Sequence, residues 1–214
     1  MSASTARGPY QKGIKRREEI VRSASAVFAE FGYVGGSLRA IASSVGVTPA
    51  TLVQYFGSKE GLLEAVLDAW TAQTHELYTK DLHGLRYFRS LPELMSFHVN
   101  HRGLIELFLT MAAEASSPVH PARAFVQQRY GQIFERFSQH LRESRESGET
   151  ALTEHEIATE SRLLIATMDG LELQWLIDPT VDLRGLFDEY LDQAIARWTA
   201  PRARRVRRAG LVMT

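Results

Sequence analysis

Apolar residues return every three or four positions along almost the whole chain, and this is the spacing of amphipathic α-helices. Between residues 20 and 31, for example, they stand at Ile20, Ala24, Val27, Phe28 and Phe31. No segment alternates apolar and polar residues with the period of two expected for a half-buried strand. The sequence therefore predicts an all-α protein of about nine helices. We expect them near residues 14–31, 37–45, 48–56, 58–83, 92–100, 103–116, 120–147, 154–177 and 182–199.

Glycines and capping residues divide the first 60 residues into three short helices. Gly32 ends the first apolar stripe, in the position after a helix where a left-handed residue is least strained. Ser37 is a natural N-cap for the second helix, and Thr48 followed by Pro49 suits the start of the third. Gly46 lies in the tight turn between these two helices. Two short helices joined in this way form a helix-turn-helix arrangement.

Charge is segregated along the chain, although Lys/Arg and Asp/Glu are equal at 25 each. Residues 1–61 carry eight basic and four acidic residues, and residues 197–214 carry six arginines and no acid. The stretch between them holds 11 basic and 21 acidic residues. A protein that binds a polyanion can have this layout, with its basic parts facing phosphate. Charge runs often only solvate a surface, so the pattern is supporting evidence at most.

Several classes of protein fit the sequence poorly. The chain has no cysteine, which excludes disulfides and thiolate zinc sites. Its first 22 residues are polar and basic, and no run of 18 apolar residues occurs, so we expect a cytoplasmic protein without signal peptide or membrane span. A glycine-rich phosphate loop, a paired-carboxylate motif and a nucleophile elbow are all missing, which argues against an enzyme. We expect no cofactor.

The helix-turn-helix stretch resembles the TetR family of regulators. Residues 37–48 read SLRAIASSVGVT and residues 51–63 read TLVQYFGSKEGLL. The family's pattern is R-x-I-A, then A-G-V-S/T, then L-Y-x-Y/H-F, then S-K-E-x-L-L. Spacing agrees without gaps from Ile14 to Leu67, and residues 168–179 resemble a segment common in one branch of the family.

This resemblance implies a sequence-specific transcriptional regulator that binds a palindromic or near-palindromic duplex DNA operator as a homodimer. A repressor released by a small-molecule effector is the favoured form. The alternatives are an activator of the same family and a helical dimer that binds a protein partner instead of DNA. The implied organisation is a basic arm at 1–13, a three-helix DNA-binding domain at 14–60, a larger helical ligand-binding and dimerisation domain at 61–200, and an Arg-rich, disordered tail at 201–214.

The resemblance also implies which residues contact DNA. In the family, the third helix lies in the major groove. The matching positions are Ser37, Arg39, Thr48, Pro49, Ala50, Thr51, Val53, Gln54, Tyr55 and Lys59. Val53 stands where the family commonly has Tyr, and Gly36 where it commonly has Thr. Because each departure removes a polar contact, we expect the basic residues from Arg7 to Arg17 to contribute more.

The C-terminal part of the chain carries two further expectations. Candidate effector-lining residues are Met95, His98, Phe108, Met111, Tyr130, Phe134, Met168 and Gln174, a mixture that indicates a hydrophobic or mixed organic effector. The last two helices show more apolar surface than one core needs, which predicts a four-helix dimer interface. Its expected residues are Leu164, Met168, Leu171, Trp175, Leu183, Phe187, Tyr190, Leu191 and Ala194. His98 and His101 have metal-compatible spacing but no evident third ligand, so no metal site is predicted.

Overall fold

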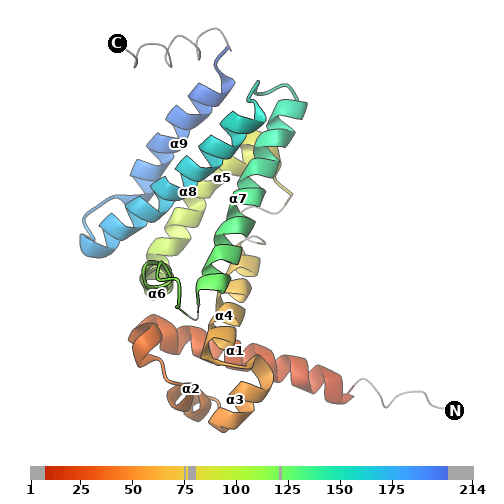
Figure 1. Ribbon diagram of the computed structural model, residues 1–214, viewed down its shortest axis with the longest axis vertical. Coiled ribbons are helices and arrows are strands. Elements are labelled where there is room, and N and C mark those ends of the chain that lie inside the picture. The colour runs from red at the N-terminus through yellow and green to blue at the C-terminus, as the bar shows by residue number, and fades with distance from the viewer. Residues whose placement is uncertain (1–7, 75, 77–80, 121, 202–214) are drawn as a thin grey trace, which may run out of the picture. The chain divides into compact units, whose positions relative to one another are not determined.

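The computed structural model describes residues 8–74, 76, 81–120 and 122–201, and within them it contains helices and no strand (Figure 1). The predicted all-α fold is confirmed. The α-helices of this part of the chain are α1 (Gly8–Gly35), α2 (Leu38–Ser44), α3 (Pro49–Phe56), α4 (Lys59–Thr74), α5 (Gly84–Asn100), α6 (Arg102–Glu114), α7 (Arg123–Glu146), α8 (Glu154–Ile177) and α9 (Leu183–Thr199). None of them is long and apolar enough to cross a membrane.

Three helix boundaries differ from the sequence-based expectation. α1 begins at Gly8, so residues 8–13 are helical instead of forming an arm. The described helix α4 runs to Thr74, and residues 81–83, which were expected to be helical, are not. α5 begins at Gly84 and continues through Pro92, where a helix start was expected. Proline removes one helical hydrogen bond. A continuous buried stripe nevertheless crosses it, formed by Leu85, Phe88, Leu91 and Met95.

The described residues divide into two compact units. Unit 1 contains the chain up to Gln73 together with His101–Arg123, and unit 2 contains Thr74–Asn100 and the chain from Ala124 onward. Helix α6 therefore belongs to the same unit as α1–α3, although the sequence placed it in the C-terminal domain. The first seven residues and the expected Arg-rich tail at 201–214, apart from Pro201, lie outside the described part of the chain.

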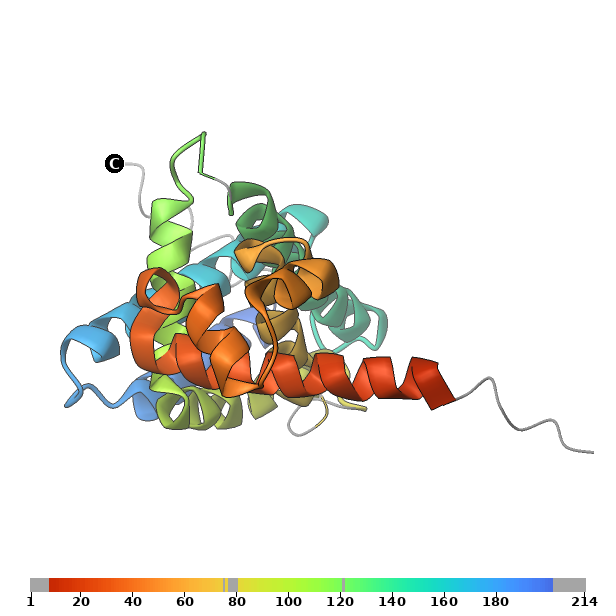
Figure 2. The same ribbon diagram turned by 90° about the horizontal axis from the view of Figure 1, so that it is seen from below.

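Unit 1 is built on α1, which packs against both α2 and α6, while α2 packs against α3. The contact with α6 is close because α6 carries Gly103 there. A Cβ atom on Gly103 would lie only 2.1 Å from the carbonyl oxygen of Ala29 in α1. In Figures 1 and 2, the N-terminal turns of α1 extend beyond the α2–α3 pair. Basic residues Lys12 and Lys15 are exposed on these turns.

Unit 2 consists of α5, α7, α8 and α9, with both α5 and α8 packed against α9. Six residues expected at the dimer interface are instead buried in the core of this unit. They are Leu164, Trp175, Leu183, Phe187, Leu191 and Ala194. Met168, Leu171 and Tyr190 are half-buried against the same core. Neighbouring helices of the same chain therefore cover much of the apolar stripes of α8 and α9.

Candidate DNA-binding surface

The helix-turn-helix is held in shape by the caps that the sequence predicted. The Ala40 N–H donates to Ser37 Oγ over 3.1 Å, and the Thr51 N–H donates to Thr48 Oγ1 over 3.2 Å. Gly46 has a φ of 65°, which is the left-handed region that favours glycine. This turn allows the next N–H, from Val47, to donate to the carbonyl oxygen of Ala42 over 2.9 Å. The start of α3 is thereby fixed relative to α2.

The two short helices bury one face and expose the other. Ile41, Ala42 and Leu52 are buried within unit 1. Most of the residues expected to contact DNA are exposed: Ser37, Arg39, Thr48, Pro49, Ala50, Val53, Gln54 and Tyr55. Thr51 is half-buried, and its hydroxyl is 2.9 Å from that of Thr48. α3 thus presents a surface of small, apolar and amide side chains together with the phenol ring of Tyr55.

Two basic residues that were expected to help bind DNA make contacts inside unit 1. Arg16 donates to the carbonyl oxygen of Val45 over 2.6 Å and pairs with Glu19 at 2.8 Å. The guanidinium of Arg17 lies 5.1 Å from the centre of the Phe56 ring. Both side chains therefore hold α1 against the helix-turn-helix.

Lys59 has an internal partner that the sequence did not reveal. Its ammonium group donates to the Tyr33 carbonyl oxygen and lies 4.3 Å from the centre of the Tyr33 ring. Burial lowers the pKa of Lys59. The Tyr33 hydroxyl in turn donates to the Glu60 carboxylate, which lowers the pKa of Glu60. These contacts fasten the end of α1 to the start of α4.

Packing explains why position 36 is a glycine where the family commonly has threonine. A Cβ atom at this position would lie 2.6 Å from Cδ1 of Phe28 and 2.9 Å from the carbonyl oxygen of Gly32. The Gly36 N–H also donates to that carbonyl oxygen over 2.9 Å. A threonine, as the family commonly has here, would not fit without moving α1. The chain therefore lacks the threonine hydroxyl at this position because its backbone passes too close to Phe28 for a side chain.

The residues expected around an effector are divided between the two units. Phe108 and Met111 belong to α6 in unit 1, whereas the other six belong to unit 2. Gln174 is exposed, and its amide donates to the carbonyl oxygen of Gly170 over 3.2 Å. Met95, Phe134 and Met168 lie in or against the core of unit 2.

Unit 2 also contains one buried and one half-buried polar pair. Nδ1 of His98 lies 2.5 Å from Oε1 of Glu172, with both side chains buried. The Tyr130 hydroxyl donates to Asp169 over 2.7 Å. Burial, reinforced by the nearby Glu172 charge, raises the pKa of Asp169 from 3.8 to about 6. The sequence pointed to His98 and Tyr130 but not to the two carboxylates, because α8 offered no signal of which side they face.

Comparison with known families covers both parts of the chain. Residues 20–66 match the model of bacterial regulatory proteins of the tetR family, and residues 88–200 match that of the C-terminal region of BetI-type transcriptional repressors. The chain belongs to the TetR family.

Individual TetR relatives are distant. The HTH-type transcriptional regulator UidR of Escherichia coli is 25% identical over 156 residues, which are 72% of this chain and 79% of that protein. A transcriptional regulator from Saccharomonospora viridis, solved in complex with choline, has a TM-score of 0.64 at 22% identity and covers 85% of this chain and 95% of its own. A TetR regulator from Chloroflexus aurantiacus has a TM-score of 0.68, also at 22% identity, over 87% and 96% of the two chains.

Proposed function

We propose that this TetR-family chain is a sequence-specific DNA-binding transcriptional repressor whose helix α3 enters the major groove. The observation that carries the proposal is the exposed face of α3, presented by a helix-turn-helix whose caps and turn are all formed. The major groove of B-DNA is about 12 Å wide and admits an α-helix. A protein partner in place of DNA is the alternative, which the binding titration below tests.

The proposed contacts divide by chemistry. Gln54 can bond both edge atoms of an adenine, and Ala50 or Val53 can touch a thymine methyl group. Thr48 and Pro49, at the start of α3, would face the neighbouring base edges, and Arg39 a base or phosphate. The proposed phosphate contacts are Ser37, Thr51, Tyr55 and Lys59. Lys59 keeps further donors for this role after its bond to Tyr33, because an ammonium group has three.

The test is a binding titration on the DNA that flanks the protein's own gene, compared with a shuffled duplex of the same composition. We expect the wild type to prefer the genomic duplex, and affinity for both to fall as salt rises. Q54A should lose about 1–3 kcal/mol of that preference. Q132A, which changes an exposed glutamine of α7, is the matched control and should behave as wild type. Equal wild-type affinity for the two duplexes would exclude the proposed function.

A homodimer is part of this proposal, with a revised interface. α8 carries an apolar stripe whose members repeat at the spacing of one helix face. Four of its residues are exposed, Leu163, Ala166, Leu173 and Ile177, and Gly170 between them is half-buried. Leu173 is 52% exposed and Ile177 is 77% exposed. Such a stripe on a long helix suits packing against the same helix of a second subunit.

We further propose that the effector is a small organic cation that binds at the polar pairs of unit 2. Two carboxylates, Asp169 and Glu172, stand there against one histidine and the Tyr130 hydroxyl, a setting that favours a cation. Choline is the first probe, because a fold neighbour was solved with it. DNA release by choline that is lost in D169N would support this class. If choline and other quaternary ammonium compounds release no DNA, the cationic effector is wrong while DNA binding stands.

A further inference from the structure

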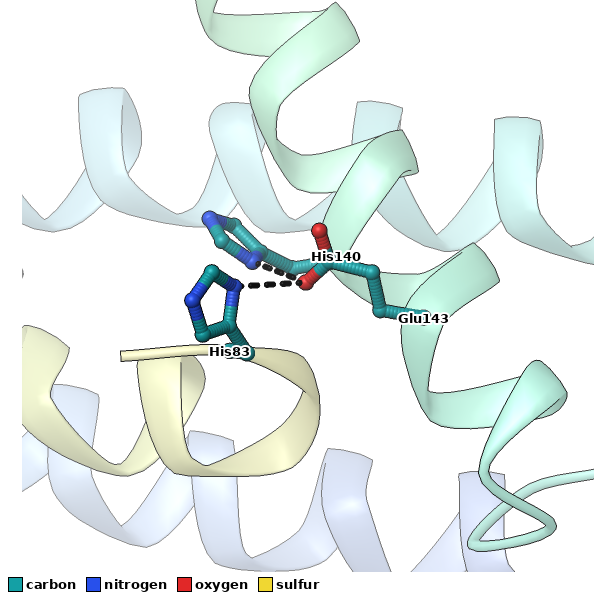
Figure 3. Close-up of side chains that lie close together, drawn as sticks. All are labelled: His83, His140 and Glu143. Carbon is teal, nitrogen blue, oxygen red and sulfur yellow. Dashed lines mark hydrogen bonds and ion pairs between the residues drawn. The ribbon is translucent and has the colours of Figure 1, made fainter. Parts of the chain in front are cut away.

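Three side chains of unit 2 converge on one another near the start of α5 (Figure 3). His83 lies just before α5, and His140 and Glu143 lie one turn apart on α7. One carboxylate oxygen of Glu143, Oε2, is 2.8 Å from Nδ1 of His140 and 3.5 Å from Nδ1 of His83. Figure 3 shows both imidazole rings facing this oxygen. The ligand atoms of all three residues lie within 4.8 Å of one another.

We propose that His83, His140 and Glu143 bind a divalent transition-metal ion of the zinc type, with water in the remaining position. Two imidazole nitrogens and one carboxylate oxygen form a recognised ligand set for such ions. This site is independent of the proposed DNA-binding function, because none of its residues belongs to unit 1.

The spacing of the ligand atoms fits a small tetrahedral ion. Bonds of about 2.0–2.2 Å to zinc place neighbouring ligand atoms roughly 3.3–3.5 Å apart. The separation of 3.5 Å between His83 and Glu143 already has this value. The separation of 2.8 Å between His140 and Glu143 is that of a hydrogen bond. A shift of about half an ångström, within reach of the side-chain torsions, would admit the ion in place of the proton.

Neighbouring groups orient the ligands. The His140 ring is stacked on Tyr87, with 3.8 Å between ring centres and 18° between ring planes. The N–H of Gly84 donates to Glu143 Oε2 over 3.2 Å. Supporting contacts of this kind fix the direction of metal ligands and raise affinity. The His83 side chain is 74% exposed, which leaves the site open to an ion from solvent.

Two further charged groups lie close to the three ligands. The guanidinium of Arg136 opposes a cation, whereas the carboxylate of Glu149, next to Gly84, favours one.

The ligand set selects the class of metal. Mg²⁺ and Ca²⁺ prefer oxygen ligands, so two imidazoles disfavour them. The full sequence contains no cysteine, so no thiolate competes for the ion. Zn²⁺ is therefore the probe, and Mg²⁺ the comparison metal.

The experiment uses the full chain without a histidine tag, stripped of metal and titrated with Zn²⁺ by calorimetry at pH 7.5. We expect one ion per chain, and a rise in melting temperature with Zn²⁺ but not with Mg²⁺. H83Q and E143Q should weaken binding at least about 100-fold. Because His83 is exposed, H83Q should fold normally, which circular dichroism checks. H155Q is the matched control, since His155 is exposed on α8 beside two glutamates.

The outcomes separate a metal site from a hydrogen-bond network. Binding that survives in H155Q and disappears in H83Q and E143Q supports the site. Failure of the wild type to bind Zn²⁺ stoichiometrically overturns it, as does binding that is unchanged in H83Q. The metal-site proposal does not require any of these variants to lose DNA binding. The metal site and the DNA-binding function are therefore tested separately.

Discussion

At the scale of single residues, several basic side chains near the helix-turn-helix make hydrogen bonds within unit 1. Arg16 bonds the carbonyl oxygen of Val45, and Lys59 bonds that of Tyr33. Each of these contacts joins α1 to a later element of unit 1. Basic charge in the first 61 residues is therefore not all available to phosphate, and the exposed Lys12 and Lys15 become the main free cations on the N-terminal turns of α1.

Gly36 provides a test of packing behind the helix-turn-helix. G36A would place a Cβ atom 2.6 Å from Phe28 and 2.9 Å from a backbone oxygen, and the backbone cannot easily yield. We expect the free energy of unfolding to fall by about 1–3 kcal/mol. The control is G13A in α1, where a Cβ atom meets nothing within 4 Å. That change should leave stability unchanged or raise it by up to about 1 kcal/mol. Thermal unfolding followed by circular dichroism measures both, and a neutral G36A would contradict the packing argument.

At the scale of elements, α7 and α8 are joined by polar pairs as well as by apolar packing. The Tyr130 hydroxyl of α7 bonds Asp169 of α8, and the hydroxyls of Ser138 and Ser161 lie 3.1 Å apart in the core. Buried polar groups are costly unless they are paired. The pair at Asp169 responds to pH, because burial raises the pKa of its carboxyl group.

D169N should stabilise the protein in a pH-dependent way. The folded chain holds the Asp169 proton with a pKa of about 6, against 3.8 ordinarily, so the folded state binds the proton more tightly. Wild-type stability therefore falls as pH rises between about 4 and 6 and stays lower above that window. Asparagine keeps an oxygen for the Tyr130 hydroxyl without the charge. We expect D169N to exceed the wild type by up to about 3 kcal/mol at pH 7.5.

Urea unfolding at pH 4 and at pH 7.5 checks this expectation. The advantage of D169N should nearly vanish at pH 4, where the wild-type carboxyl is protonated in the folded state. D188N removes an exposed carboxylate of α9 and controls for net charge. An equal effect of D169N at the two pH values would show that burial of this carboxyl is not its cause.

The same elements show what a sequence can and cannot predict. The caps at Ser37 and Thr48 and the turn at Gly46 were predictable because their signals are local. The continuation of α5 through Pro92 was not, because its cause is burial against distant helices. The cluster of His83 with His140 and Glu143 joins residues nearly 60 positions apart, which no spacing rule connects. Likewise, the stripes of α8 and α9 show that a face is buried, without showing whether the same chain or a partner covers it.

At the scale of the whole molecule, the proposed repressor needs two copies of α3 to read a palindromic site. Half-sites one helical turn apart require recognition helices about 34–36 Å apart, which a stable dimer must set. Most residues first expected at the interface are already buried within one chain. The assembly therefore depends on the surface that remains, above all the exposed stripe of α8.

Replacing two residues of this stripe with glutamate should prevent dimer formation. In L173E/I177E, charges would replace side chains that are 52% and 77% exposed, so folding should survive while pairing is lost. Sedimentation velocity should show a dimer for the wild type and a monomer for the variant. Affinity for a duplex with two half-sites should fall by about 10²-fold or more, because the second contact is no longer tethered to the first. V119E is the control, since Val119 is a 90% exposed residue of unit 1. A variant that remains dimeric would place the interface elsewhere, whereas a monomeric variant with unchanged affinity would show that the operator is read by one chain.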